Sequence, residues 1–177
     1  MRLTLIARMT TVSSCRCMPA SSLVELVLLR HGIAEARLNG LDHSERALTT
    51  LGRQRTRLMV ETLVGRGLEV DRLITSPYRR AMETAQIALQ AGLAPVLDVD
   101  EQLSPGGEPL VLLQGLRGRI ALVGHEPDLG QLACRLLGLT SGLIVLKKAG
   151  LVQLRSAAEG WQLAGLLRPG LVLDRQV

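Results

Sequence analysis

Apolar runs and segments of helical spacing alternate along most of the chain. Short apolar runs bounded by turn residues predict strands, at 24–29, 68–75, 95–99 and 120–123. Segments with helical spacing or helix-capping residues predict helices, at 51–64, from Pro77 onward, at 110–116 and at 129–137. A final pair of strands is expected at 150–154 and 161–167, joined by a polar turn. This alternation predicts an α/β protein with a three-layer α/β/α sandwich.

Residues that begin and end helices refine two of these predictions. Thr49 or Thr50 suits the N-cap of the helix at 51–64, and glycines follow its end. Ser76 can cap the next helix, with Pro77 at its first position. The arginines at 53, 55 and 57 are interpreted as an exposed helix face.

The first 22 residues differ in composition from the rest of the chain. They mix Thr, Ser, Cys, Met and Arg with one short apolar patch, which is too interrupted for the apolar core of a secretory signal. We interpret 1–22 as a disordered leader or a mis-assigned start, with Met18 as an alternative first residue. One domain is therefore expected over 23–177.

Composition narrows the possible partners. The chain has no Phe, one Trp and one Tyr, so it lacks the aromatic platforms on which single-stranded nucleic acids stack. A net charge of +5 favours anionic ligands such as phosphates, but the basic residues are spread along the chain. Three cysteines do not form a disulfide framework and favour a reducing compartment. No apolar run is long enough to cross a membrane, so we expect a cytoplasmic protein without membrane or nucleic-acid partners.

The chemistry-bearing residues follow the ends of predicted strands. Arg30, His31 and Gly32 end the first apolar run, and His125 ends the run at 120–123. Arg79 and Arg80 lie on different faces at the start of the helix after the second strand, so at most one of them is expected to face the site. Ligands of open α/β sheets bind at the carboxyl ends of the strands, so these side chains are expected to meet there. Two arginines and two imidazoles can surround a phosphoryl group, and a neutral His31, its tautomer held by a backbone carbonyl, can attack phosphorus.

Two polar loops offer further candidates. In the loop at 33–46, the polar residues Asp42, His43, Glu45 and Arg46 can border a pocket, but each alone is better interpreted as a solvated loop residue. Glu101 and Glu108 are the carboxylates most able to act as proton donors. Their simpler interpretation is loop solvation and a charge near a helix N-terminus.

Three segments together resemble the signatures of a known family. Leu28-Leu29-Arg30-His31-Gly32, the stretch from Ser76 to Ala85 and Val123-Gly124-His125-Glu126-Pro127 resemble, in the same order, the motifs of the histidine phosphatase superfamily. The chain looks closest to the short SixA-type phosphohistidine phosphatases, although Ala47 stands where that branch has proline. The resemblance implies a phosphoglycerate mutase-like fold in its minimal form, without a cap domain.

The resemblance also implies roles for the site residues. His31 would be the nucleophile that becomes phosphorylated, and His125 would be the second pocket histidine. Arg30 and Arg80 would bind phosphoryl oxygens, since the family's motif spacing falls on Arg80 rather than on Arg79. No metal or other cofactor is implied. The expected function is a phosphohistidine phosphatase acting on a protein, and a monomer is favoured.

Other functions remain open at this point. A general small-molecule phosphomonoesterase would use the same residues, and a mutase is disfavoured because it needs a closed site. A non-catalytic module that binds phosphorylated ligands would keep the pocket, although the intact His31 argues against it. A nucleic-acid-binding domain rests on net charge alone.

Overall fold

The central element is a six-stranded mixed sheet with the order β3-β2-β4-β1-β5-β6. The structure is a computed structural model, and it describes residues 24–173. The strands are β1 Val24–Arg30, β2 Arg72–Thr75, β3 Leu97–Val99, β4 Gly118–Gly124, β5 Leu151–Ala157 and β6 Gly160–Leu167. Strands β1 to β4 are parallel, whereas β5 pairs antiparallel with both β1 and β6. The predicted leader at 1–22 lies outside the described residues.

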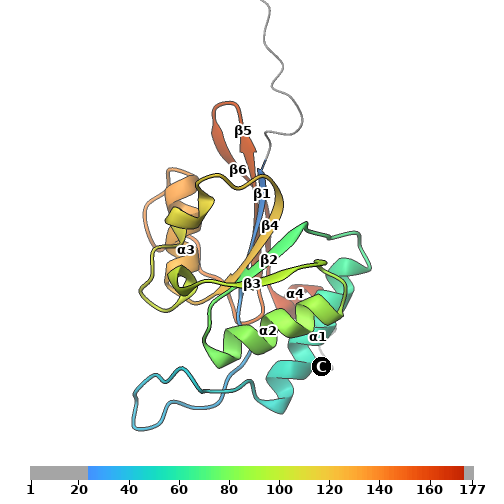
Figure 1. The fold of residues 1–177 in the computed structure, drawn as a ribbon, viewed down its shortest axis with the longest axis vertical. Coiled ribbons are helices and arrows are strands. Elements are labelled where there is room, and N and C mark those ends of the chain that lie inside the picture. Colours follow the sequence, from blue (N-terminus) through green and yellow to red (C-terminus); the bar gives the residue numbers. More distant parts are fainter. Residues whose placement is uncertain (1–23, 174–177) are drawn as a thin grey trace, which may run out of the picture.

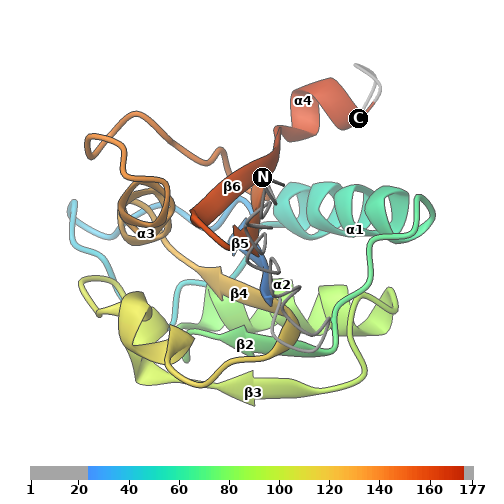
Figure 2. The same cartoon turned by 90° about the horizontal axis from the view of Figure 1, so that it is seen from above.

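Helices cover both faces of the sheet (Figures 1 and 2). One face carries α1 (Thr50–Val64), α2 (Arg79–Gln90) and the short α4 (Pro169–Val172). The other face carries α3 (Asp128–Leu136) together with the 3₁₀ helices η2 (Glu101–Leu103) and η3 (Pro109–Leu113). None of the helices in residues 24–173 is long and apolar enough to cross a membrane.

Strand β1 shows how the sequence builds two cores from one sheet. Successive side chains of a strand point to opposite faces. Val27 and Leu29 pack into the core beneath α1 and α2, while Leu26 and Leu28 pack into the core beneath α3. All four are almost fully buried, which explains why β1 is continuously apolar rather than alternating. The predicted three-layer α/β/α sandwich is confirmed.

Three local predictions are wrong in their boundaries. The second strand begins at Arg72, because the Leu68 N–H still bonds to the Leu63 carbonyl at the end of α1. Helix α2 begins at Arg79, so Ser76 does not cap it. The segment predicted as a helix at 110–116 is instead the 3₁₀ helix η3, which ends before Gly115 at φ +83°.

The turn from β1 into the first loop packs tightly on the start of α1. Thr49 is the N-cap of α1, and its side chain accepts a hydrogen bond from the Gly52 N–H (3.0 Å). The Thr49 N–H donates to the Ile33 carbonyl (2.9 Å). A Cβ added to Gly52 would lie 2.0 Å from that same carbonyl oxygen. Only glycine allows this approach between the loop and the helix.

We therefore expect Gly52→Ala to destabilise the fold. The clash is with backbone, which cannot rotate away, and overpacking of this kind costs about 1–3 kcal/mol. Gly170→Ala is a suitable control, because an added Cβ there meets nothing within 4 Å. Urea unfolding of the two variants measures the difference in the free energy of unfolding. Equal stability of both variants would show that the approach is not tight.

Candidate active site

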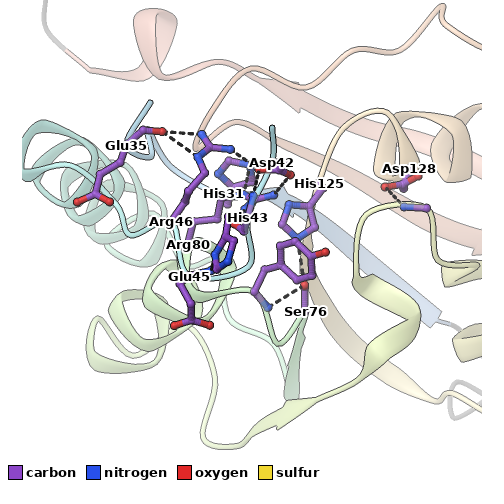
Figure 3. Close-up of polar contacts among 12 residues, drawn as sticks. His31, Glu35, Asp42, His43, Glu45, Arg46, Ser76, Arg80, His125 and Asp128 are labelled. Carbon is purple, nitrogen blue, oxygen red and sulfur yellow. Dashed lines mark hydrogen bonds and ion pairs between the residues drawn. The ribbon is translucent and has the colours of Figure 1, made fainter. Parts of the chain in front are cut away.

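The carboxyl ends of β1, β2 and β4 meet at one edge of the sheet. The His31 N–H donates to the Gly124 carbonyl (3.1 Å), and the Ser76 N–H donates to the Val123 carbonyl (3.0 Å). These bonds extend the parallel pairing just past the strand ends. They bring the residues that follow β1 and β2 beside His125, the residue that follows β4 (Figure 3).

All of the predicted site residues line one cavity at this edge. Its volume is about 430 Å³, and it contains Arg30, His31, Arg80 and His125. The remaining lining residues come from loops: Arg37, Asp42, Arg46, Pro105, Glu126, Pro127 and Lys148. The cavity thus has five basic side chains besides its two histidines, an arrangement suited to an anion.

Hydrogen bonds define the tautomer of His31. Its Nδ1 lies 2.7 Å from the Gly32 carbonyl oxygen, which can only accept, so Nδ1 carries the proton. Its Nε2 lies 3.3 Å from the Nε–H of Arg80 and accepts from it. The lone pair of the imidazole is therefore on Nε2, on the side of the arginine. The sequence predicted that a backbone carbonyl holds the tautomer of His31, and that carbonyl belongs to Gly32.

Both site histidines are neutral over the physiological range. Burial, together with His125 and the two arginines, lowers the pKa of His31 to about 2, although the hydrogen bond to Gly32 acts in the opposite direction. Burial and the charges of Arg80 and Arg30 lower the pKa of His125 to about 3. The two rings lie with centroids 5.1 Å apart. A neutral His31 keeps the lone pair that a nucleophile needs.

Arg80 is held from three directions. Its Nη2 donates to Asp42 (2.7 Å) and its Nη1 donates to the His43 carbonyl (3.1 Å). Its guanidinium lies over the Tyr78 ring, 4.9 Å from the centroid. The neighbouring Arg79 is exposed and pairs with Glu83 instead (3.1 Å). The structure therefore brings Arg80, as the sequence predicted, and not Arg79 to the site.

Two polar atoms of the predicted phosphate-binding residues have no protein partner. Among residues 24–173, the buried Arg30 Nε and His125 Nδ1 form no hydrogen bond. Arg30 Nη1 is occupied, since it donates to the Leu146 carbonyl (2.7 Å). Buried polar groups without partners are rare in folded proteins, and the third such atom in this part of the chain, Thr56 Oγ1, lies outside the cavity lining. The other two atoms belong to side chains that line the cavity.

Ser76 links His125 to the start of α2. Its Oγ accepts from the Tyr78 N–H (3.2 Å) and lies 3.0 Å from His125 Nε2. Because the hydroxyl proton is not used by the backbone amide, it is free to be donated to Nε2. When Ser76 donates this proton, the imidazole proton lies on Nδ1, the atom without a protein partner among residues 24–173. His125 in this tautomer is a neutral hydrogen-bond donor toward a ligand.

Comparison with known proteins assigns this geometry to a family. The sequence model described as "Histidine phosphatase superfamily (branch 1)" matches residues 26–104. An uncharacterized protein of Picosynechococcus sp. (strain PCC 7002) is 39% identical over 143 residues, which cover 76% of this chain and 87% of that protein. The chain belongs to the histidine phosphatase superfamily. The resemblance inferred from the three sequence motifs is confirmed.

Similarity within the superfamily extends to SixA. The phosphohistidine phosphatase SixA of Escherichia coli (strain K12) is 28% identical over 153 residues, covering 80% of this chain and 94% of that protein. A solved structure of the protein histidine phosphatase SixA complexed with tungstate has a TM-score of 0.73 at 24% identity. That alignment covers 82% of this chain and 97% of the other. These similarities support the SixA-type branch and a minimal fold, with no cap domain inserted within residues 24–173.

Glu101 and Glu108, the proton donors suggested by the sequence, do not line the active-site cavity. Glu108 is exposed and pairs with Arg135 (2.9 Å), and Glu101 accepts from the Ser104 hydroxyl (3.0 Å). Neither residue lines the cavity. The carboxyl that does, besides Asp42, is Glu126, which accepts from the Leu146 N–H (3.1 Å). Burial raises the pKa of Glu126.

Asp42 and Arg46 are more than solvated loop residues. They form an ion pair with each other, and Asp42 also binds Arg80. Burial alone would raise the pKa of Asp42, but its hydrogen bonds and charge interactions with the two arginines hold it below its usual value. Arg46 in turn donates to the Glu35 carbonyl. The loop at 33–46 is thereby fastened over the site, as Figure 3 shows.

The two neutral histidines make stability depend on pH. Their pKa values of about 2 and about 3 lie below the value of about 6.5 in an unfolded chain. Their contribution is therefore fully present above about pH 6.5 and is lost as the pH falls toward the folded-state values. At about pH 5 the loss is about 2 kcal/mol for each histidine.

We expect urea unfolding to show that the free energy of unfolding decreases between about pH 6.5 and pH 5, and that it decreases less in His125→Asn. An identical pH dependence in wild type and in this variant would contradict the role of His125.

Proposed function

We propose that this protein is a metal-independent phosphohistidine phosphatase that dephosphorylates a protein through a covalent phosphohistidine on His31. The observation that carries the proposal is the orientation of His31. Its Nδ1–H is fixed by Gly32, and its Nε2 accepts from Arg80 in a cavity that Arg30 and His125 also line. The similarity to the phosphohistidine phosphatase SixA supports the same proposal.

In the first step, the Nε2 lone pair of His31 forms a bond to phosphorus. The bond between phosphorus and the substrate imidazole breaks, and its electron pair stays on the leaving nitrogen; because the other ring nitrogen of the substrate carries a proton, a neutral imidazole departs. Arg30 and Arg80 stabilise the charge on the phosphoryl oxygens, and the Nδ1–H of His125 donates to one of them. As the attack proceeds, the Nε–H of Arg80 shifts its hydrogen bond from Nε2 of His31 to a phosphoryl oxygen.

In the second step, water attacks the phosphorus of phosphorylated His31. The N–P bond breaks, its electron pair returns to Nε2, and inorganic phosphate leaves with the oxygen of water. The Gly32 carbonyl stabilises the Nδ1–H while the ring carries the phosphoryl group. Water and substrate are the sole reactants that this sequence of steps requires.

A phosphohistidine substrate fits the positions of the carboxylates. An imidazole leaves phosphorus more easily than an alkoxide, so it depends less on a strong proton donor. Glu101 and Glu108 lie outside the cavity. We expect Glu101→Gln and Glu108→Gln to keep kcat on a phosphohistidine protein within about twofold of wild type, well below the 10²–10⁴-fold that a general acid contributes. A steady-state assay checks this, and a hundredfold loss in either variant would identify a proton donor.

The alternative is a small-molecule phosphomonoesterase with the same nucleophile. Glu126 favours it, because this carboxyl lines the cavity and its burial raises its pKa, so a protonated form can be offered to an alkoxide. A non-catalytic binding module is less consistent with the neutral, oriented His31. The cytoplasmic location and the monomeric state stay predictions from the sequence.

Turnover of two substrates distinguishes these functions. Wild type is assayed with a phosphohistidine-bearing protein and with p-nitrophenyl phosphate, each in the presence of EDTA. The proposal predicts faster turnover of the phosphohistidine protein, unaffected by the chelator. Turnover of the ester alone would establish the phosphomonoesterase. Binding of phosphate without turnover of either substrate would establish the binding module.

A further inference from the structure

A second cavity adjoins the active site. It has a volume of about 420 Å³ and lies between the start of α1, the segment before β5 and the start of α4. Its lining consists of Ile33, Gly52, Arg55, Lys147, Lys148, Ala149, Arg168, Pro169 and Gly170. Lys148 also lines the active-site cavity, so the two cavities share this residue.

All charged side chains that line this second cavity are positive. Four of its residues are cationic, namely Arg55, Lys147, Lys148 and Arg168. Within the described part of the chain, no carboxylate lines the cavity and none of the four cations forms an ion pair. Arginines elsewhere do find partners, for example Arg72 with Asp98 and Arg155 with Glu25. An accumulation of unpaired cations around a hollow attracts anions.

The wall between the two cavities is a well-defined turn. The Gly150 N–H donates to the Lys147 carbonyl (2.7 Å), with Ala149 at φ +57°. The Ala149 N–H donates to the carbonyls of Arg30 and His31 (3.2 Å each). The turn is therefore bonded directly to the backbone of the nucleophile. A group in the second cavity would lie one turn away from the phosphoryl group.

The uncharged part of the lining is apolar or backbone. Ile33, Ala149 and Pro169 contribute it, with the glycines at 52 and 170. A small, fully solvated anion would gain little from these surfaces. A peptide segment that combines carboxylates with aliphatic side chains complements both the apolar lining and the cationic residues.

We propose that the second cavity docks an acidic, aliphatic segment of the substrate protein next to its phosphohistidine. This inference rests on the proposed function and deepens it by specifying the surface of the substrate. Arg55 and Arg168 bind the carboxylates, and Lys148 lies between the docked segment and the phosphoryl group. Docking lowers KM for a protein substrate without changing the chemistry at His31.

Direct binding of a peptide without any phosphoryl group tests the docking site. The probe is a dye-labelled peptide of glutamate and leucine, measured by fluorescence anisotropy, with a glutamine and leucine peptide for comparison. We expect the double variant R55Q/R168Q to bind the acidic peptide about tenfold more weakly, as loss of two charge pairs allows. Its kcat/KM on p-nitrophenyl phosphate stays at the wild-type value.

The control removes the same charge elsewhere. Arg57 and Arg117 are exposed and line neither cavity, so R57Q/R117Q is expected to bind the acidic peptide like wild type. Equal losses in both double variants, or equal binding of the two peptides, would overturn the proposal. A loss of pyrophosphate binding in R55Q/R168Q with unchanged peptide binding would replace the docking site by a small-anion site. Failure of phosphohistidine turnover would overturn the proposed function, whereas the binding of the acidic peptide, which carries no phosphoryl group, is measured independently of turnover.

Discussion

His31→Ala is expected to lower kcat by a factor on the order of 10⁴ or more, because it removes the nucleophile of the proposed reaction. The variant retains Arg30, Arg80 and His125, so the cavity still offers its donors to a phosphoryl group. Steady-state turnover of a phosphohistidine protein measures the loss. Calorimetric titration with inorganic phosphate measures whether the binding site remains.

The pair of measurements separates catalysis from folding. Loss of turnover with phosphate binding retained shows that His31 acts in the chemistry. His43→Ala provides a matched control, because its exposed ring lies in the same loop system and the Arg80 contact uses its backbone carbonyl. A His31→Ala variant that still turns over at a tenth of the wild-type rate would mean that another group attacks phosphorus.

Arg80→Ala is expected to lower kcat by about 10²–10³, the usual cost of removing one preorganised donor from a transition state. The loss has two sources, since Arg80 both binds phosphoryl oxygens in the proposed mechanism and hydrogen-bonds to His31 Nε2. Arg80→Lys is not expected to restore activity, because an ammonium cannot contact Asp42, His43 and the phosphoryl group with one planar fork.

The adjacent arginine supplies the control for this prediction. Arg79 is also an arginine in the first turn of α2, but unlike Arg80 it is exposed, and its Nε donates to Glu83. Arg79→Ala is expected to leave kcat and KM unchanged and to cost under about 1 kcal/mol of stability, as surface ion pairs do. Comparable kcat losses in the two variants would show that net charge, rather than the position of Arg80, governs turnover.

The residues that end buried strands were predictable from the sequence. Arg30, His31 and His125 follow apolar runs, and parallel strands bring their carboxyl ends to one edge. Arg80 was found through the resemblance of its segment to a family motif, since the helical pattern alone does not choose between it and Arg79. The layer structure followed from the same runs, because each of them is buried on both faces.

The contributions of the loops were not predictable in the same way. Asp42 reaches Arg80 across 38 positions of sequence, and Lys148 and Arg37 reach the cavity from separate loops. Their placement depends on tertiary bonds such as that of the Arg79 N–H to the Ser44 carbonyl (2.9 Å), which no local pattern encodes. The role of Ser76 was also missed, because its hydroxyl suited a helix cap equally well but instead contacts His125.

The central claim is that His31 carries the phosphoryl group between two half-reactions. The most direct measurement mixes the enzyme with a ³²P-labelled phosphohistidine protein, quenches within the first turnovers with alkali and maps the labelled peptide. The account predicts a label on His31 that is stable to alkali and lost in acid, and that appears and decays at rates compatible with kcat. Turnover with no label on His31, or with the label on another residue, would contradict it.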